Sequence, residues 1–287
     1  MKIVLSPNPY RDKNLHAVRE AQRILEECGV ETCMCLPFRP DHGMELPQGM
    51  HLKDIHTELR SADMLLCFGG DGTLLHSARM ARTYNVPVLG VNMGSVGFMA
   101  ELEASELEQL RRLAEGDYTL ESRMMLDMRV LRGERCIFRD TALNDVVISN
   151  GAVARVIDMV VYGDRDMMME FSGDGIVIST PTGSTAYSMS AGGPIVEPTA
   201  ENIIVTPICA HDLMTRSLVL GRDRMVAVKV GIKSHKSAYL SADGGRAFRL
   251  SGGDVAELRC SRHRINLVKL TGRSFYSILN RKLGRRQ

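Results

Sequence analysis

A glycine-rich turn that contains a single aspartate is the segment of this chain best suited to hold a phosphate. Gly69-Gly70-Asp71-Gly72-Thr73 follows the apolar run 64–68 and precedes a helical pattern that extends to about residue 82. Glycine lets the backbone approach a phosphate closely, and the free N–H groups at a helix start attract anions. Asp71 would be a carboxylate facing the phosphates, the alternative being a tight turn with a capping aspartate. We predict that four residues of this turn bind phosphate: Gly69, Gly70, Gly72 and Thr73.

A second polar segment carries hydroxyl groups and glycine at the end of an apolar strand. Asp174-Gly175 begins this strand, and the string Thr180-Pro181-Thr182-Gly183-Ser184-Thr185-Ala186-Tyr187 follows it. The hydroxyl and backbone N–H groups of such a turn can hold a base, a ribose or a phosphate, and Tyr187 can stack on a purine. A Ser/Thr turn that caps a helix starting near Ala186 is an equally good interpretation.

Asn144-Asp145 is a third candidate site, at the start of the predicted strand 146–149. An amide together with a carboxylate can hold the two vicinal hydroxyls of a ribose by paired hydrogen bonds. A turn before a strand also often uses these residue types, so the pair alone does not separate the two interpretations.

Several common catalytic motifs are missing from the sequence. The chain contains no G-x-x-x-x-G-K-[ST] phosphate loop, and the glycines near Asp71 do not complete the dinucleotide-binding pattern G-x-G-x-x-G. It contains no H-E-x-x-H, no G-x-S-x-G and no protein-kinase catalytic loop either. These absences disfavour P-loop enzymes, dehydrogenases, common hydrolases and protein kinases.

Two kinds of pattern divide the chain and position these motifs. Up to residue 120, apolar strands alternate with helical periods such as Val18, Ala21 and Leu25, and Ser105 with Glu108 forms a capping-box pattern. From 121 to 267, short β-branched segments are separated by Gly, Asp and Asn. We therefore predict an α/β domain over 1–120 and a mostly β domain over 121–267. The segment of about 268–287, helical over 275–283, would return to the first domain.

Composition indicates a globular protein of the cytoplasm. The 287 residues are 44% hydrophobic and 24% charged, with a formal net charge of +2 that gives no reason to expect a nucleic-acid partner. No apolar run is long enough to span a membrane, and the start of the chain lacks the apolar stretch of a signal peptide. The seven cysteines are odd in number and irregularly spaced, which favours reduced thiols.

Together these segments resemble the NAD kinase family. The strings at 69–72, at 142–145 and from 174 to 187 occur in the order that the family has and at about its spacing. Residues 92–98 and 272–276 are also similar to family segments, so the resemblance spans most of the chain. Its most specific part is Thr-Gly-Ser-Thr-Ala-Tyr, because Gly-Gly-Asp-Gly also occurs in diacylglycerol-type lipid kinases and phosphofructokinases.

The resemblance implies a fold and a set of site residues. The fold is α/β + β, an N-terminal Rossmann-like or flavodoxin-like α/β domain and a C-terminal β-sandwich-like domain. Asp71 would be the catalytic carboxylate. Asp145 departs from the family pattern because Glu is common there, and Ser172-Gly173 stands where a basic residue often lies. The implied NAD-binding residues are Asp71, Gly72, His76, Asn144, Asp145, Arg155, Asp174, Thr182, Thr185, Ala186, Tyr187 and Ser190.

The resemblance also implies a reaction: transfer of the γ-phosphoryl group of ATP, or of another phosphoryl donor, to the 2′-hydroxyl of the adenosine ribose of NAD, giving NADP. It implies a divalent cation, Mg²⁺, that arrives with ATP, and a homodimer or homotetramer. Two alternatives are a lipid or sugar kinase that shares Gly-Gly-Asp-Gly and a non-catalytic sensor that binds NAD or NADP. The lack of an apolar or basic membrane-facing stretch argues against the lipid kinase, and the presence of Asp71 argues against the sensor.

Overall fold

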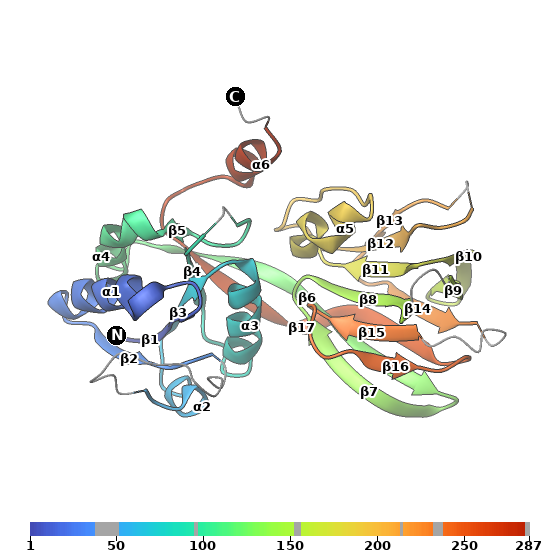
Figure 1. Ribbon diagram of the computed structural model, residues 1–287, viewed down its shortest axis with the longest axis horizontal. Coiled ribbons are helices and arrows are strands. Elements are labelled where there is room, and N and C mark those ends of the chain that lie inside the picture. Colours follow the sequence, from blue (N-terminus) through green and yellow to red (C-terminus); the bar gives the residue numbers. More distant parts are fainter. Residues whose placement is uncertain (38–51, 95–96, 152–155, 213–214, 232–237, 285–287) are drawn as a thin grey trace. The chain divides into compact units, whose positions relative to one another are not determined.

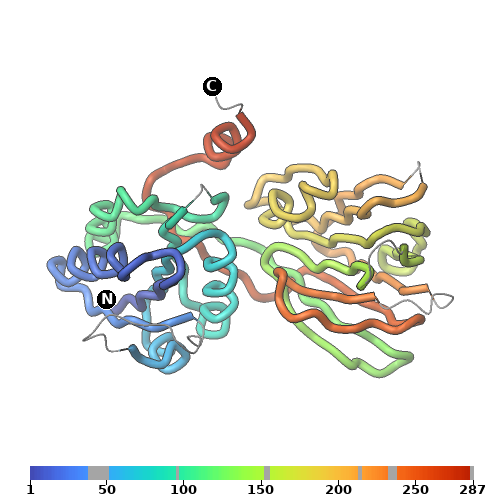
Figure 2. Tube along the Cα trace, in the orientation of Figure 1, coloured from blue at the N-terminus to red at the C-terminus, as the bar shows by residue number. Residues whose placement is uncertain are grey.

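The structure is a computed structural model that describes residues 1–37, 52–94, 97–151, 156–212, 215–231 and 238–284. The chain forms two compact units, each with its own set of internal contacts. Unit 1 comprises Met1–Ser122 with Ile265–Gln287, and unit 2 comprises Arg123–Arg264. Figure 2 shows that both the blue N-terminal part and the red C-terminal part of the chain belong to unit 1, so unit 2 is one continuous stretch.

Unit 1 is built on a parallel sheet with helices on both faces (Figure 1). The strand order is β2-β1-β3-β4, and the end of β17 adds a further parallel strand beside β4. The strands are β1 (Lys2–Ser6), β2 (Glu31–Met34), β3 (Met64–Gly69), β4 (Val88–Asn92), β5 (Leu102–Glu103) and the end of β17 (Val255–Lys269). The helices are η1 (Lys13–Leu15), α1 (His16–Glu27), α2 (Ile55–Glu58), α3 (Asp71–Arg82), η2 (Ala104–Leu110), α4 (Arg111–Ala114) and α6 (Phe275–Leu283).

Alternation along the strands of unit 1 explains why helices cover both faces of the sheet. Ile3 and Leu5 of β1 belong to one buried cluster, together with the buried residues of α1, η2 and α4. The opposite face packs against α3: a Cβ on Gly90 of β4 would lie only 2.4 Å from Leu74 Cδ1. The lack of a side chain at residue 90 therefore lets Leu74 of α3 pack closely against the sheet.

Two local predictions for unit 1 have clear outcomes. The stripe of Val18, Ala21 and Leu25 is buried on α1, as the helical period predicted. The capping box predicted at Ser105 was wrong, because Glu103 and Glu106 form it at the start of η2. Glu103 ends β5, so the chain is already extended at this residue and the helix begins two residues earlier than the Ser pattern indicates.

Unit 2 is a sandwich of two antiparallel sheets. One sheet has the order β13-β12-β11-β8-β15-β16, and the other pairs β10, β9, β14 and β17 in turn and continues through β6 to β7. The strands are β6 (Thr119–Arg132), β7 (Arg135–Ala142), β8 (Asp145–Asn150), β9 (Ile157–Gly163), β10 (Asp166–Gly173), β11 (Gly175–Ser179), β12 (Asn202–Ile208), β13 (Leu218–Gly221), β14 (Met225–Val230), β15 (Ala238–Ala242), β16 (Phe248–Leu250) and β17.

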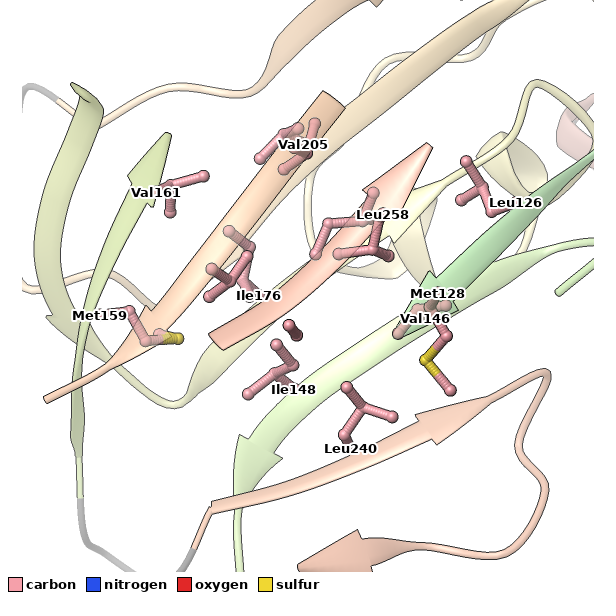
Figure 3. Close-up of a cluster of buried hydrophobic side chains, with 14 of the residues drawn as sticks. Leu126, Met128, Val146, Ile148, Met159, Val161, Ile176, Val205, Leu240 and Leu258 are labelled. Carbon is pink, nitrogen blue, oxygen red and sulfur yellow. The ribbon is translucent and has the colours of Figure 1, made fainter. Parts of the chain in front are cut away.

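The core of unit 2 fills the space between these sheets. Figure 3 shows side chains from both sheets pointing toward one another, among them Leu126 of β6, Ile176 of β11 and Leu258 of β17. These three are fully buried. Central strand β11 is buried over all five residues, because η3 (Thr182–Thr185) and α5 (Tyr187–Ser190) contact it from outside the sandwich. The core thus holds the strand that leads directly into the hydroxyl-rich turn.

Two further observations bear on the sequence-based expectations. All seven cysteines are free thiols. Among the described residues, no helix has the length and apolar character needed to cross a membrane.

Candidate active site

The Gly-Gly-Asp-Gly turn forms the start of helix α3. Gly70 is the N-cap and Asp71 is the first helical residue. The N–H groups of the first helical turn have no partner within the helix, which leaves them available to an anion. Thr73 departs from the prediction in one respect, since its own N–H already donates to Gly70 O at 3.0 Å. Its hydroxyl accepts a hydrogen bond from Asn8 Nδ2 at 2.9 Å.

The carboxylate of Asp71 is held by the loop that follows β4. Phe98 N donates to Asp71 Oδ2 at 2.9 Å, and Met99 N donates to Asp71 Oδ1 at 3.2 Å. A Cβ on Gly97 would lie 2.1 Å from Asp71 Oδ1, so a side chain at this position would displace the carboxylate. The loop therefore fixes the orientation of Asp71, a role that the sequence did not reveal for residues 97–99.

His76 lies on the same face of α3 as Gly72, because the two are four residues apart. Its side chain already has a partner: the Nε2 atom lies 2.6 Å from the carbonyl oxygen of Pro37. A contact between His76 and a nucleotide therefore stays a prediction, and it would have to involve another part of the ring or replace this hydrogen bond.

Asn144 and Asp145 lie at the start of β8 in unit 2 and are both buried. Asn144 Oδ1 has no hydrogen-bond partner among the described residues, which leaves a buried acceptor free for a ligand. Burial, together with the nearby carboxylate of Asp243, raises the pKa of Asp145 to about 7. The pair thus presents an amide oxygen and a carboxyl group that changes charge near neutral pH.

The hydroxyl-rich turn after β11 packs directly against this pair. Thr180 Oγ1 donates to Leu143 O at 2.6 Å, and Thr180 N donates to Asn144 O at 2.9 Å. A Cβ on Gly183 would lie 2.1 Å from Asn144 O, so only glycine allows this close approach. The structure therefore brings together two motifs that are more than thirty residues apart in the sequence.

The remaining residues of this turn differ in exposure. Thr182 and Thr185 are buried, and Arg123 Nη1 donates to Thr182 Oγ1 at 3.3 Å. Ala186 is half-buried, whereas Tyr187 and Ser190 are exposed on α5. Tyr187 thus has an open face on which a base can stack.

Asp174 does not join this group, since it precedes β11 and the turn follows it. Six residues at about 3.3 Å each separate Asp174 from Thr180, so the two lie roughly 20 Å apart. Asp174 Oδ1 accepts a hydrogen bond of 3.4 Å from Asn150 Nδ2. One ribose cannot contact both ends of β11, and Arg155 lies outside the described residues.

No three acidic, His or Cys side chains gather into a metal site in the part of the chain that the structure describes. Asp71 is the carboxylate beside the predicted phosphate-binding turn.

Comparisons with known proteins agree with these observations. Residues 3–118 match the N-terminal domain of ATP-NAD kinases, and residues 143–270 match the C-terminal domain. The chain is 39% identical to the NAD kinase of Acetivibrio thermocellus over 286 residues, covering 99% of this chain and 97% of the relative. It is 42% identical to the NAD kinase of Natranaerobius thermophilus over 282 residues, covering 97% and 96%.

Two solved structures have the same fold. Yeast NADH kinase complexed with NADH superposes with a TM-score of 0.85 at 24% identity, covering 100% of this chain and 88% of that chain. An NAD kinase from Archaeoglobus fulgidus in complex with ATP gives 0.73 at 22% identity, covering 99% and 97%. These similarities confirm the predicted α/β + β fold class.

Both domain matches are to parts of a single kind of enzyme, so the protein is a phosphotransferase. With 39% identity over nearly its full length to a relative of the same size, the chain belongs to the NAD kinase family.

Proposed function

We propose that this protein transfers the γ-phosphoryl group of ATP to the 2′-hydroxyl of the adenosine ribose of NAD and so makes NADP. The observation that carries the proposal is the fixed carboxylate of Asp71 at the N-terminus of α3, where both its oxygens accept backbone N–H groups. A carboxylate beside free helix N–H groups is suited to hold an attacking hydroxyl next to a phosphate.

Recognition of NAD falls mainly to unit 2 in this proposal. The unpartnered Oδ1 of Asn144 and the carboxyl group of Asp145 bind the ribose hydroxyls, and the hydroxyls of the following turn complete the nucleotide site. Asp174, at the other end of β11, contacts a different part of the dinucleotide. The full proposed set is Asp71, Gly72, His76, Asn144, Asp145, Arg155, Asp174, Thr182, Thr185, Ala186, Tyr187 and Ser190.

Asp71 acts by orientation and by accepting a proton late in the reaction. Phosphoryl transfer depends on placing the attacking oxygen in line and on stabilising charge on the phosphoryl oxygens. A carboxylate is too weak a base to ionise a ribose hydroxyl in advance, so it takes the proton as the bond to phosphorus forms. The backbone N–H groups of Gly69, Gly70 and Gly72 bind the phosphates, and Thr73 contributes through its hydroxyl group.

A divalent cation, Mg²⁺, accompanies ATP in this proposal. It would neutralise charge on the phosphates, and Asp71 is the residue of this turn that can contribute a ligand. Following the family resemblance, we also propose a homodimer or homotetramer and a cytoplasmic location.

The proposal is tested by NADP formation from NAD, ATP and Mg²⁺ with the wild type and with Asp71→Asn, measured with an NADP-specific dehydrogenase. The wild type should turn over, and the variant should lose more than about a hundredfold in kcat because it cannot accept the proton. NAD binding, measured by calorimetry, should persist in the variant.

Removal of Mg²⁺ with a chelator should abolish turnover by the wild type. A well-folded wild type that binds NAD but phosphorylates it with neither ATP nor polyphosphate would contradict the proposal. Full activity of Asp71→Asn would contradict the role given to Asp71.

A further inference from the structure

Asp243 comes directly after β15, in the segment that joins it to β16, and has a backbone φ of +49°. The next residue, Gly244, has a φ of +66°, and Gly245 N donates to Ala242 O at 2.8 Å. Two consecutive positive φ angles are typical of the tightest β-hairpin turns, in which Asp-Gly is a favoured pair. The hairpin thus holds Asp243 in a left-handed backbone conformation.

The side chain of Asp243 binds the backbone of the residues proposed to hold the ribose. Its Oδ2 accepts from Leu143 N at 2.8 Å, and its Oδ1 accepts from Asn144 N at 2.8 Å and from Asp145 N at 3.2 Å. Asp243 N in turn donates to Asp145 O at 2.9 Å. Three consecutive N–H groups therefore converge on one carboxylate.

The same stretch of backbone is held from its other side by Thr180, which bonds the carbonyl oxygens of Leu143 and Asn144. With the N–H groups on Asp243 and these carbonyls on Thr180, the peptide units around Asn144 have little freedom. These hydrogen bonds restrict the directions of the Asn144 and Asp145 side chains, because a side chain can be held precisely only if its backbone is fixed.

Asp243 also acts on Asp145 electrostatically. Burial is the larger cause of the raised pKa of Asp145, and the nearby carboxylate of Asp243 adds to it, because a negative charge close by disfavours a second one. Arg123 on β6 donates a hydrogen bond to the Thr182 hydroxyl of the neighbouring turn. Asp243 is the charged group whose field raises the pKa of Asp145.

We propose that Asp243 is a positioning residue for NAD: its carboxylate fixes the turn that presents Asn144 and Asp145, and its charge makes NAD affinity depend on pH in the neutral range. This inference rests on the proposed function, because it presumes that Asn144 and Asp145 bind the ribose. An ionised Asp145 accepts stronger hydrogen bonds from the ribose hydroxyls than a protonated one, so affinity should rise with pH.

The test is the dissociation constant for NAD of the full-length protein, measured by calorimetry between pH 5.5 and 8.5. For the wild type, affinity should rise with a midpoint near the Asp145 pKa of about 7. Asp243→Asn keeps the left-handed backbone but removes the charge and one acceptor. It should bind NAD about tenfold more weakly at pH 8, with its midpoint about one pH unit lower.

Asp164→Asn is the matched control. Asp164 also has a positive φ, +56°, in a hairpin of unit 2, and its Oδ1 accepts from Met225 N at 3.0 Å. This variant should bind NAD with the affinity and midpoint of the wild type. Asp243→Glu retains the charge but lengthens the arm, so it should weaken binding while keeping the wild-type midpoint.

An Asp243→Asn variant with wild-type affinity, or with weaker binding at an unchanged midpoint, would overturn the inference, since a purely structural role does not move the pH profile. If Asp243→Asn does not fold, Asp243→Glu decides the question. The inference would be overturned if Asp243→Glu bound NAD as tightly as the wild type, or if its affinity changed at a different pH midpoint. A wild type that binds no NAD at any pH contradicts the proposed function instead.

Discussion

The geometry around Asp71 shows how a carboxylate can be fixed and still accept a further hydrogen bond. Each carboxylate oxygen accepts a single backbone N–H, from Phe98 or from Met99. A carboxylate oxygen has two lone pairs, so each keeps one for a further hydrogen bond. The loop therefore sets the direction of the carboxylate without using up its capacity to accept a hydroxyl proton.

Gly97→Ala tests this arrangement by adding a single methyl group beside the carboxylate. Its Cβ would lie 2.1 Å from Asp71 Oδ1, so the carboxylate must move. We expect kcat to fall about a hundredfold, because a shift of about 1 Å in a reacting group can cost that much. The dissociation constant for NAD should change much less than kcat, because most of the residues that we propose to bind NAD lie in unit 2.

Gly94→Ala is the matched control for this prediction. A Cβ there would come no closer than 3.9 Å to Arg11 Nη1, so the variant should keep the wild-type kcat. Equal rates for the two variants in the NADP assay would show that Gly97 has no special role beside Asp71.

The sequence proposes single site residues only where the signal is local. Asp71 and the Asn144-Asp145 pair are candidates because glycines, a strand end or an amide beside a carboxylate mark them, and their roles stay predictions. Asp243 was missed, although Asp-Gly is a hairpin signal, because its partner Leu143 lies 100 residues earlier in the chain. Gly97 was missed for the same reason, since its importance depends on a side chain of another element.

At the scale of elements, the two turns of unit 2 that we propose to bind NAD depend on close contact between backbones. Gly183 in η3 faces Asn144 O, which belongs to the turn between β7 and β8. Gly183→Ala would place a Cβ 2.1 Å from that oxygen and push the two turns apart. Overpacking of this kind costs about 1–3 kcal/mol. We expect urea unfolding to show this loss and calorimetry to show at least tenfold weaker NAD binding.

Gly221→Ala serves as the control, because nothing lies within 4 Å of its Cβ position at the end of β13. It should match the wild type in both measurements. If Gly183→Ala also matched the wild type, the contact between the two turns would not matter for the site.

Elements with a strong apolar period were predictable, and long polar strands were not. Helix α6 spans Phe275–Leu283, as its period predicted. Strand β17 runs over Val255–Lys269, which is much longer than the short β segments that the sequence predicted for this domain. Its first part carries Arg259, Arg262 and His263, exposed charged or polar side chains that hide the alternation. Pairing with β14 stabilises the strand from Val255 to Arg259, and such partners cannot be read from a single segment.

At the scale of the whole molecule, the dependence of stability on pH is shaped by two kinds of buried carboxyl group, those with a lowered pKa and one with a raised pKa. Burial opposes the ionisation of Glu101, yet Lys269 and Thr271 hold the pKa of its carboxyl group below the ordinary value. Burial likewise opposes the ionisation of Asp254, whose pKa Arg132 lowers. Both groups stabilise the fold above their ordinary pKa values, and this stabilisation is lost as pH falls through the lowered ones.

Asp145 has the reverse effect. Its folded-state pKa of about 7 lies above the ordinary value of 3.8, so the folded state prefers the protonated form. Between these two values the folded chain binds more protons than the unfolded chain, and stability must fall as pH rises. Because each pKa unit corresponds to about 1.4 kcal/mol, the loss from pH 4 to 8 is on the order of 4 kcal/mol. The protein without NAD should therefore be most stable at mildly acidic pH.

Asp145→Asn should remove the fall in stability at neutral pH while leaving the acid limb unchanged, because the amide mimics the protonated carboxyl group in size and charge. In urea unfolding followed by far-UV circular dichroism, the variant should exceed the unfolding free energy of the wild type by roughly 1.5 kcal/mol at pH 5 and by roughly 4 kcal/mol at pH 8, because the destabilising effect of Asp145 begins above its ordinary pKa of 3.8. The control Asp166→Asn removes an exposed carboxylate of the same unit and should change stability by less than about 0.5 kcal/mol at either pH.

A wild type whose stability does not fall between pH 5 and 8 would contradict the raised pKa of Asp145. A variant that gains stability but loses NAD binding would show that this buried carboxyl group is retained for the ligand at a cost to the fold.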